Sequence, residues 1–120
     1  MAENTEASDV LRELWARIDA QDWDGLAGLL DPGLTAHYTH TGENFSPDEL
    51  VRLNREYPGR WHVDVEDLVG EGARAVSLAR VSDGTRTHHV ASFATVRGGL
   101  VTELVEVWAE SGVPVPDDRR

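Results

Sequence analysis

The sequence contains no cysteine and no lysine. All eleven of its basic residues are arginine. The missing thiol excludes disulfides, cysteine nucleophiles and zinc sites that use cysteine. The missing lysine amine excludes chemistry through a lysine Schiff base. Acid–base catalysis by histidine and carboxylate side chains is therefore the main enzymatic route that remains open.

Long apolar runs and positive charge are also scarce. No stretch approaches the ~18 apolar residues of a membrane-spanning helix. The N-terminus is acidic and lacks the apolar core of a signal peptide. A formal net charge of -11 disfavours nucleic acid and anionic membrane surfaces as partners. We therefore expect a soluble cytoplasmic protein whose partner is a small molecule.

What the sequence does contain is the composition of one globular domain. Its 120 residues are 40% hydrophobic and 28% charged, which suffices for a single core. We expect one domain over residues 1–120, with its core at about 8–110, an irregular acidic N-terminus and a proline-containing C-terminal tail. The spacing of apolar residues predicts helices at 8–20, 23–30 and 46–56, and strands at 34–40, 61–68, 73–82, 85–97 and 100–109.

Capping signals define where the helices begin. The run Ser46-Pro-Asp-Glu49 is a capping box with proline at the first helical position. Asp22 is a suitable cap for the second helix, and Ser8 or Asp9 for the first. Helices followed by long antiparallel strands predict an α+β fold. We expect a curved antiparallel sheet shaped as a cone, with three N-terminal helices closing an internal ligand pocket.

Two turns set the predicted strand register. Asp83-Gly84 and Gly98-Gly99 are each typical of a two-residue hairpin turn. Counting back from these turns predicts that Arg80 faces Thr87 and that His89 faces Trp108. One face of the sheet would then be the pocket face, and it would carry Val76, Leu78, Arg80, His89, Ala91, Phe93, Leu104, Glu106 and Trp108.

Two segments resemble the nuclear-transport-factor-two-like superfamily, and particularly its SnoaL-like polyketide cyclase branch. Residues 14–31, LWARIDAQDWDGLAGLLD, are similar to the opening helix pair of the family. Residues 93–108, FATVRGGLVTELVEVW, resemble its final hairpin, which usually ends in an acid and an aromatic residue. The resemblance covers about residues 8–110 and implies the cone fold. It does not imply one activity, because the superfamily includes isomerases, cyclases, dehydratases, epoxide hydrolases and binding modules.

The resemblance also suggests roles for individual residues. Arg80 and Glu106 resemble the arginine and one acid of limonene epoxide hydrolases, but the second acid falls near Ser82, which cannot replace it. His37 falls near the general-base position of ketosteroid isomerases and is followed by Tyr38. The first helix offers no tyrosine for the oxyanion hole of those isomerases. Both specific chemistries are therefore disfavoured.

Three residues are predicted as catalytic. His37 would be the base, because an unperturbed histidine titrates near neutral pH; a structural histidine on a short strand is the alternative. Glu106 would be an acid or an orienting group, and Arg80 would stabilise an anion. An ion pair between Arg80 and Glu106 is the alternative for both. The predicted ligand-binding residues are Trp15, Tyr38, Trp61, Leu78, His89, Phe93 and Trp108.

These residues predict a cofactor-free acid–base enzyme, of the isomerase, cyclase or dehydratase type, for a small apolar or polycyclic carbonyl metabolite. A non-catalytic ligand-binding or dimeric accessory domain is the alternative. Metal is not expected, because His37 and His40 would lie on opposite faces of an extended strand. The valines predicted on the outer sheet face, Val81, Val90, Val105 and Val107, suggest a homodimer through that face.

Overall fold

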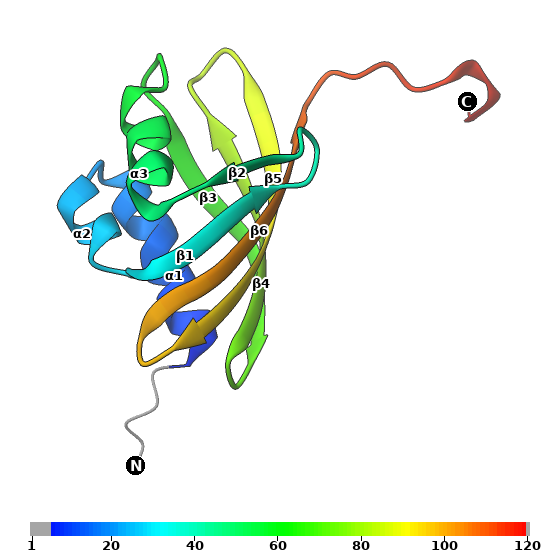
Figure 1. Ribbon diagram of the computed structural model, residues 1–120. Coiled ribbons are helices and arrows are strands. Elements are labelled where there is room, and N and C mark those ends of the chain that lie inside the picture. The colour runs from blue at the N-terminus through cyan, green and yellow to red at the C-terminus, as the bar shows by residue number, and fades with distance from the viewer. Residues whose placement is uncertain (1–5, 120) are drawn as a thin grey trace.

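The computed structural model describes residues 6–119. Within this range the chain forms three α-helices and a six-stranded curved sheet that does not close (Figure 1). The helices are α1 (Ala7–Asp19), α2 (Trp23–Ala27) and α3 (Pro47–Glu56). The strands are β1 (Leu30–Tyr38), β2 (Glu43–Phe45), β3 (His62–Glu71), β4 (Arg74–Ser82), β5 (Thr87–Arg97) and β6 (Leu100–Glu110). The predicted α+β cone is confirmed, whereas residues 1–5 of the predicted irregular N-terminus lie outside the described residues.

The helix ends show which capping predictions hold. Ser46 accepts a hydrogen bond from the Glu49 backbone N–H at 3.2 Å, and the Glu49 carboxylate accepts one from the Ser46 backbone N–H at 2.8 Å. This reciprocal pair is the predicted capping box, and Asp22 likewise caps α2. The caps predicted for α1 are wrong, because that helix already begins at Ala7 and Glu6 occupies the cap position.

The sheet has the strand order β2-β1-β6-β5-β4-β3. The pair β1–β6 is parallel and every other pair is antiparallel. Strand β2 lies between the predicted strand 34–40 and the predicted helix 46–56, and it forms by pairing with β1 at the edge of the sheet. The run Asp31-Pro-Gly33, which separates the predicted helix 23–30 from the predicted strand 34–40, lies inside β1 where the register with β6 shifts between Leu30 and Thr35.

The hairpin between β4 and β5 is longer than predicted. Ser82 pairs with Thr87, so four residues form the loop instead of two. The Asp83 side chain stabilises this wider loop by accepting hydrogen bonds from the backbone N–H groups of Thr85 at 2.9 Å and Arg86 at 2.7 Å. The prediction that Arg80 faces Thr87 is therefore wrong by two residues, because Arg80 pairs with His89. A two-residue shift does not change which side chains of β4 and β5 share a face.

The hairpin between β5 and β6 contains a bulge that changes the faces. The predicted two-residue turn is present, since Arg97 pairs with Leu100 and both Gly98 and Gly99 have positive φ, 59° and 79°. Beyond it, Val96 pairs with Val101 but Thr95 pairs with Glu103. The extra residue, Thr102, shifts the register by one. His89 consequently pairs with Ala109 instead of Trp108.

The bulge divides the predicted pocket face into two parts that lie on opposite sides of the sheet. Glu106 and Trp108 keep their inward position, but their neighbours on β5 are Ser92 and Val90. The predicted pocket residues of β4 and β5 point outward instead. They are Val76, Leu78, Arg80, His89, Ala91 and Phe93.

The helices pack on the inner face of the sheet (Figure 1). Helix α1 buries Val10, Leu11, Leu14 and Trp15. The positions it covers carry small buried side chains, including Ala75, Ser77, Ala79, Ser92 and Ala94. Small residues allow a helix to approach a sheet closely, and they leave room for the Trp15 indole. No helix within residues 6–119 is long and apolar enough to cross a membrane.

The capping box supplies a prediction about stability. Ser46→Ala removes the acceptor for the Glu49 N–H, so it should lower the free energy of unfolding by about 1 kcal/mol. Ser46→Asp keeps an acceptor at the same position and should retain most of the stability. Urea denaturation of the three proteins measures the difference. Equal stability of the alanine variant and the wild type would contradict the prediction.

Candidate functional site

A cavity of about 440 Å³ lies between the inner face of the sheet and the helices. Its walls are mainly aromatic. The chain has four tryptophans and two tyrosines, and all six line this cavity. Aromatic walls suit a flat, largely apolar ligand, and the polar residues that share the lining, among them Glu43, Arg55 and Glu110, can contact its polar groups. The six are Trp15, Trp23, Tyr38, Tyr57, Trp61 and Trp108.

A buried carboxyl group, Glu106, lies directly behind this wall. The Glu106 residue is only 3% exposed. Trp108 donates a hydrogen bond from Nε1 to Glu106 Oε1 at 3.0 Å, and Ser92 donates one from Oγ to Oε2 at 3.1 Å. The Tyr38 hydroxyl also hydrogen-bonds to this carboxyl group. Donors from strands β1, β5 and β6 therefore hold Glu106 in one position.

Burial and hydrogen bonding act on Glu106 in opposite directions. Burial disfavours the carboxylate and raises the pKa of Glu106 to about 7, although the hydrogen bonds from Trp108, Ser92 and Tyr38 lower it in part. The pKa of Tyr38 is raised too, first by burial and then by the neighbouring Glu106 charge. Tyr38 thus remains a neutral hydroxyl donor, while Glu106 gains or loses a proton near neutral pH.

Tyr38 and His40 carry polar atoms into the cavity from the end of β1. Both residues line it, and their rings stack with centroids 5.6 Å apart. The Nδ1 atom of His40 accepts a hydrogen bond from the backbone N–H of Trp108 at 3.4 Å. A neutral imidazole that accepts at Nδ1 carries its proton on Nε2. His40 and Tyr38 are therefore neighbouring hydrogen-bond donors.

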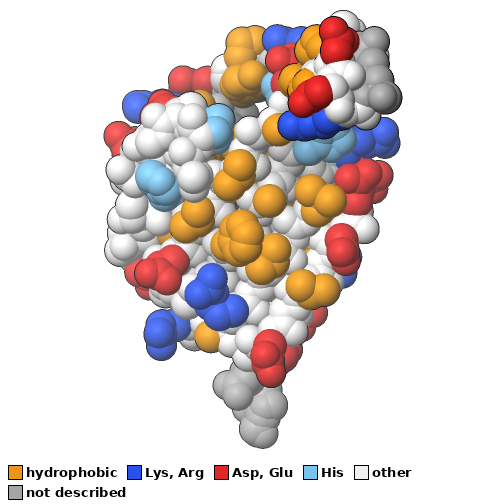
Figure 2. Space-filling model, turned by 90° about the vertical axis from the view of Figure 1, so that its right-hand side faces the viewer, with side chains coloured by type: hydrophobic (Ala, Val, Ile, Leu, Met, Phe, Trp, Pro, Cys, Tyr) orange, Lys and Arg blue, Asp and Glu red, His pale blue; other side chains and the backbone are white. Residues whose placement is uncertain are grey.

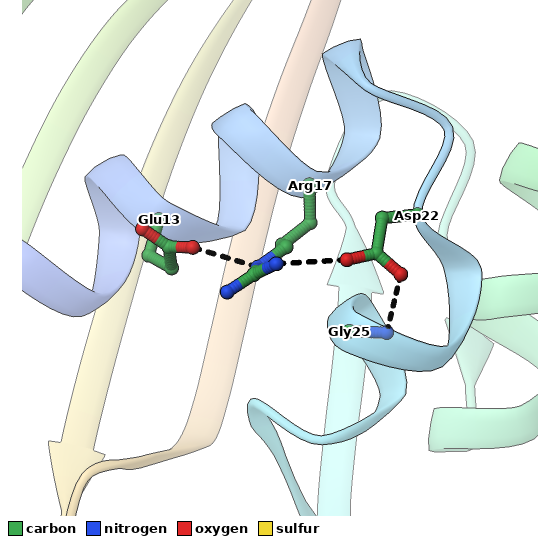
Figure 3. Close-up of polar contacts among 4 residues, drawn as sticks. All are labelled: Glu13, Arg17, Asp22 and Gly25. Carbon is green, nitrogen blue, oxygen red and sulfur yellow. Dashed lines mark hydrogen bonds and ion pairs between the residues drawn. The ribbon is translucent and has the colours of Figure 1, made fainter.

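The junction between α1 and α2 positions the part of the wall formed by Gln21 and Trp23. Arg17 donates to Asp22 at 2.8 Å and pairs with Glu13 at 2.6 Å (Figure 3). The Gly25 backbone N–H donates to the same Asp22 carboxylate at 2.9 Å. This bond and Arg17 lower the pKa of Asp22. Any side chain at Gly25 would collide with that carboxylate, which explains the glycine.

Four predicted ligand-binding residues line the cavity: Trp15, Tyr38, Trp61 and Trp108. Trp15 also donates a hydrogen bond from Nε1 to Ser77 Oγ at 3.1 Å, which anchors α1 to the sheet. Glu106 lies behind Tyr38 and Trp108 without being part of the cavity lining. These five residues are the part of the predicted site that the fold brings together.

Two predicted catalytic residues lie on the opposite side of the sheet from the cavity. His37 alternates with Tyr38 along β1, and its Nδ1 hydrogen-bonds to the Asn44 side chain at 2.9 Å. Arg80 is 51% exposed at its side chain and lies 3.7 Å from Asp64. The predicted placement of both in the pocket is wrong, and so is the alternative ion pair between Arg80 and Glu106.

Three predicted ligand-binding residues also face outward. Leu78 and Phe93 are 44% and 38% exposed, and His89 hydrogen-bonds to Ser111 Oγ at 2.6 Å. Their predicted pocket position is wrong because the bulge at Thr102 reverses the relation between β5 and β6. Within residues 6–119, no group of three or more histidine and acidic side chains is arranged to hold a metal ion.

Two histidines of the cavity wall, His40 and His88, were missed by the sequence reasoning. His40 lies in the turn after β1, but within the predicted strand 34–40 it shares a face with Tyr38, so the alternation that placed Tyr38 could have found it. His88 was assigned to the outer face by the same register that placed His89 inside. Ser92, the buried partner of Glu106, was missed for the same reason.

The raised pKa of Glu106 predicts how stability depends on pH. The folded protein binds the proton more tightly than the unfolded chain, whose carboxyl group has an ordinary pKa near 4.5. This contribution to stability is complete below pH 4.5 and is lost as pH rises through about 7. The loss should be on the order of 3 kcal/mol.

Glu106→Gln removes this titration. Urea denaturation between pH 4 and about pH 8 should show that the variant lacks this part of the wild-type decline. All other ionisable groups are the same in the two proteins, so the difference between the two curves isolates Glu106. Parallel curves would show that the pKa of Glu106 is the same in the folded and unfolded states.

Solved structures with the same fold include proteins of several kinds. A candidate ketosteroid isomerase from Kribbella flavida DSM 17836 has a TM-score of 0.83 and 25% identity, covering 92% of this chain and 82% of that one. An NTF-2 like protein of unknown function from Burkholderia xenovorans LB400 has a TM-score of 0.79 and 22% identity, covering 92% and 88%. IdmH, a candidate polyketide cyclase from Streptomyces antibioticus, has a TM-score of 0.73 and 16% identity, covering 87% and 92%.

The comparison with curated proteins gives no match. The family model for the SnoaL-like domain matches residues 11–104. This match covers well over half of the chain and includes the segment 14–31 and residues 93–104 of the second segment that carried the resemblance in the sequence. The chain therefore belongs to the SnoaL-like domain family and has the NTF2-like fold.

Proposed function

We propose that this protein is an acid–base enzyme that acts on a small, largely apolar carbonyl compound in the aromatic cavity. The observation that carries the proposal is the contact between Tyr38, which lines the cavity, and the buried Glu106 carboxyl group behind it. A hydroxyl group backed by an acid with a pKa of about 7 is suited to proton transfer at neutral pH. Relatives with this fold include the candidate isomerase and cyclase named above.

Tyr38 and His40 would act at the oxygen of the substrate. When a carbonyl compound loses a proton from its α-carbon to water, negative charge develops on the carbonyl oxygen. When Glu106 is protonated, its O–H can donate to the Tyr38 oxygen, which frees the Tyr38 hydroxyl proton. The Tyr38 hydroxyl and His40 Nε2–H are then the donors that can stabilise this charge. Protonated Glu106 can then replace a proton that Tyr38 delivers to the oxygen. Water then returns a proton to Glu106. Loss of the α-proton with charge developing on the oxygen is a step shared by isomerisation, cyclisation and dehydration of such compounds.

A non-catalytic binding role is the second candidate, and one observation favours it. Both Glu106 oxygens already accept hydrogen bonds, and Glu106 does not itself line the cavity. A carboxyl group with these contacts can serve only to fix Tyr38 and Trp108 in the wall. The two candidate functions differ in whether the cavity accelerates a reaction or only holds a ligand.

The proposal predicts that the protein accelerates exchange of the α-protons of 2-tetralone, a small bicyclic ketone, with deuterium from the solvent. Tyr38→Phe should reduce the protein-dependent rate by roughly 100-fold or more, since it removes a donor to the developing charge. Glu106→Gln should reduce it also and should change its pH dependence. Proton NMR in deuterated buffer measures the rate.

His37→Ala is the matched control, because His37 lies on β1 beside Tyr38 but on the opposite face. This variant should exchange 2-tetralone at the wild-type rate. If the wild-type protein binds the ketone by calorimetry and exchanges it no faster than buffer does, the non-catalytic role is correct. Equal rates in wild type and Tyr38→Phe would exclude Tyr38 from the chemistry.

We also propose a homodimer through the outer face of the sheet. Hydrophobic side chains gather on this face (Figure 2). Leu78, Phe93 and Val107 are 44%, 38% and 39% exposed there, on three adjacent strands. Val105 and Val107 belong to the outer face as predicted, whereas Val81 and Val90 are buried on the inner face. An apolar patch on adjacent strands is a common protein–protein contact surface.

The dimer proposal predicts the effect of a charge within this patch. Leu78→Asp should convert a wild-type dimer into a monomer, because an unpaired carboxylate would be buried in the contact. Val113→Asp adds the same charge at an exposed valine of the C-terminal tail and should leave the dimer intact. Size-exclusion chromatography with light scattering measures the mass. A monomeric wild type would contradict the proposal.

A further inference from the structure

His88 has a buried polar atom with no hydrogen-bond partner. In the part of the chain that the structure describes, its Nε2 atom is closed to solvent and has no hydrogen-bond partner. The same residue lines the aromatic cavity. Buried polar atoms in folded proteins nearly always have a partner, so an unpaired one calls for an explanation. A ligand in the cavity is the partner that its position allows.

The register places His88 on the other side of Trp108 from Tyr38. On β6, the central strand, Tyr38 pairs with Glu106 and His88 pairs with Glu110, so Trp108 lies midway between the two levels. Four residues along a strand span about 13 Å. Both rings lie near the Trp108 indole, with centroid distances of 6.2 Å for Tyr38 and 6.3 Å for His88. Polar groups therefore occur at two ends of one aromatic wall.

We propose that His88 binds a second polar group of the ligand, at the opposite end from Tyr38. This inference rests on the proposed function for the Tyr38 end and adds a substrate class to it. The ligand would be a flat apolar body with a hydrogen-bonding oxygen at each end, such as a fused-ring hydroxyketone. A compound with one oxygen would leave His88 Nε2 unpaired and would bind more weakly.

The Trp61 ring packs against His88 and would cover its Nε2 atom. The two rings lie 5.3 Å apart between centroids, and Trp61 donates a hydrogen bond from Nε1 to the Pro58 carbonyl at 2.7 Å. Trp61 lies just before β3, which begins at His62. The hydrogen bond to Pro58 and the ring contact with His88 hold the Trp61 ring at the cavity wall. A ligand reaches His88 Nε2 when the Trp61 ring moves aside.

Reaction with diethyl pyrocarbonate, which modifies accessible neutral imidazoles, tests this cover. Mass spectrometry should show slow modification of His88 in the wild type and faster modification in Trp61→Ala. His62 is the internal reference, because its side chain is 67% exposed. An equal ratio of His88 to His62 modification in both proteins would show that Trp61 does not cover His88.

Calorimetric titration with two probes tests the binding role itself. 2,6-Dihydroxynaphthalene has an oxygen at each end, and 2-naphthol has one. The wild type should bind the dihydroxy probe roughly tenfold more tightly, the value of one additional hydrogen bond. His88→Phe keeps an aromatic ring but no polar atom, and it should bind both probes with equal affinity.

His89→Phe is the matched control, because the adjacent residue lies on the outer face. It should keep the tenfold preference. A preference that survives in His88→Phe, or a wild type without any preference or binding, would overturn the proposal. These titrations measure binding alone, so they are separate from the exchange assay. Loss of exchange with an intact preference would reject the catalytic proposal and leave the role of His88 in place.

Discussion

The site depends on one constraint, the extra residue in strand β6. Thr102 has no partner on β5, and its bulge reverses which β6 side chains share a face with β5. Glu106 and Trp108 thereby meet Ser92 and Val90 beneath the helices. Without the bulge, Glu106 and Trp108 of β6 would lie on the opposite side of the sheet from Ser92 and Val90 of β5. The aromatic cavity, the buried Glu106 and the apolar patch on the outer sheet face all follow from this register.

The second constraint is energetic. Burying a carboxylate costs free energy, and hydrogen bonds offset this cost only in part. The part that is not offset raises the pKa of Glu106 to about 7. An apolar residue at this position would pack more simply against Trp108. The chain instead provides Ser92 and Tyr38 as further partners from two other strands. Such an arrangement is typical of residues retained for chemistry or for fixing the wall of a binding site.

Much of the fold could be predicted from local signals. The capping box at Ser46 and the glycine turn at Gly98 depend on neighbouring residues, and both are as predicted. Which side chains of β5 and β6 line the cavity depends on the register between these strands, and no local sequence signal reveals the bulge at Thr102. Because the bulge was not predicted, His89 was placed on the inner face and His88 on the outer face. Residues placed from β1 and the helices, such as Tyr38 and Trp15, did not depend on this hairpin and were placed in the cavity.

The distribution of tryptophan has a consequence for spectroscopy. All four indoles of the chain line one cavity, and none lies elsewhere. Ultraviolet emission of the protein therefore comes from this single place, with neither a distant indole to dilute the signal nor one on the outer sheet face to respond to self-association. A change in emission colour or intensity would report directly on whether the cavity is filled. The protein thus contains its own optical reporter of occupancy.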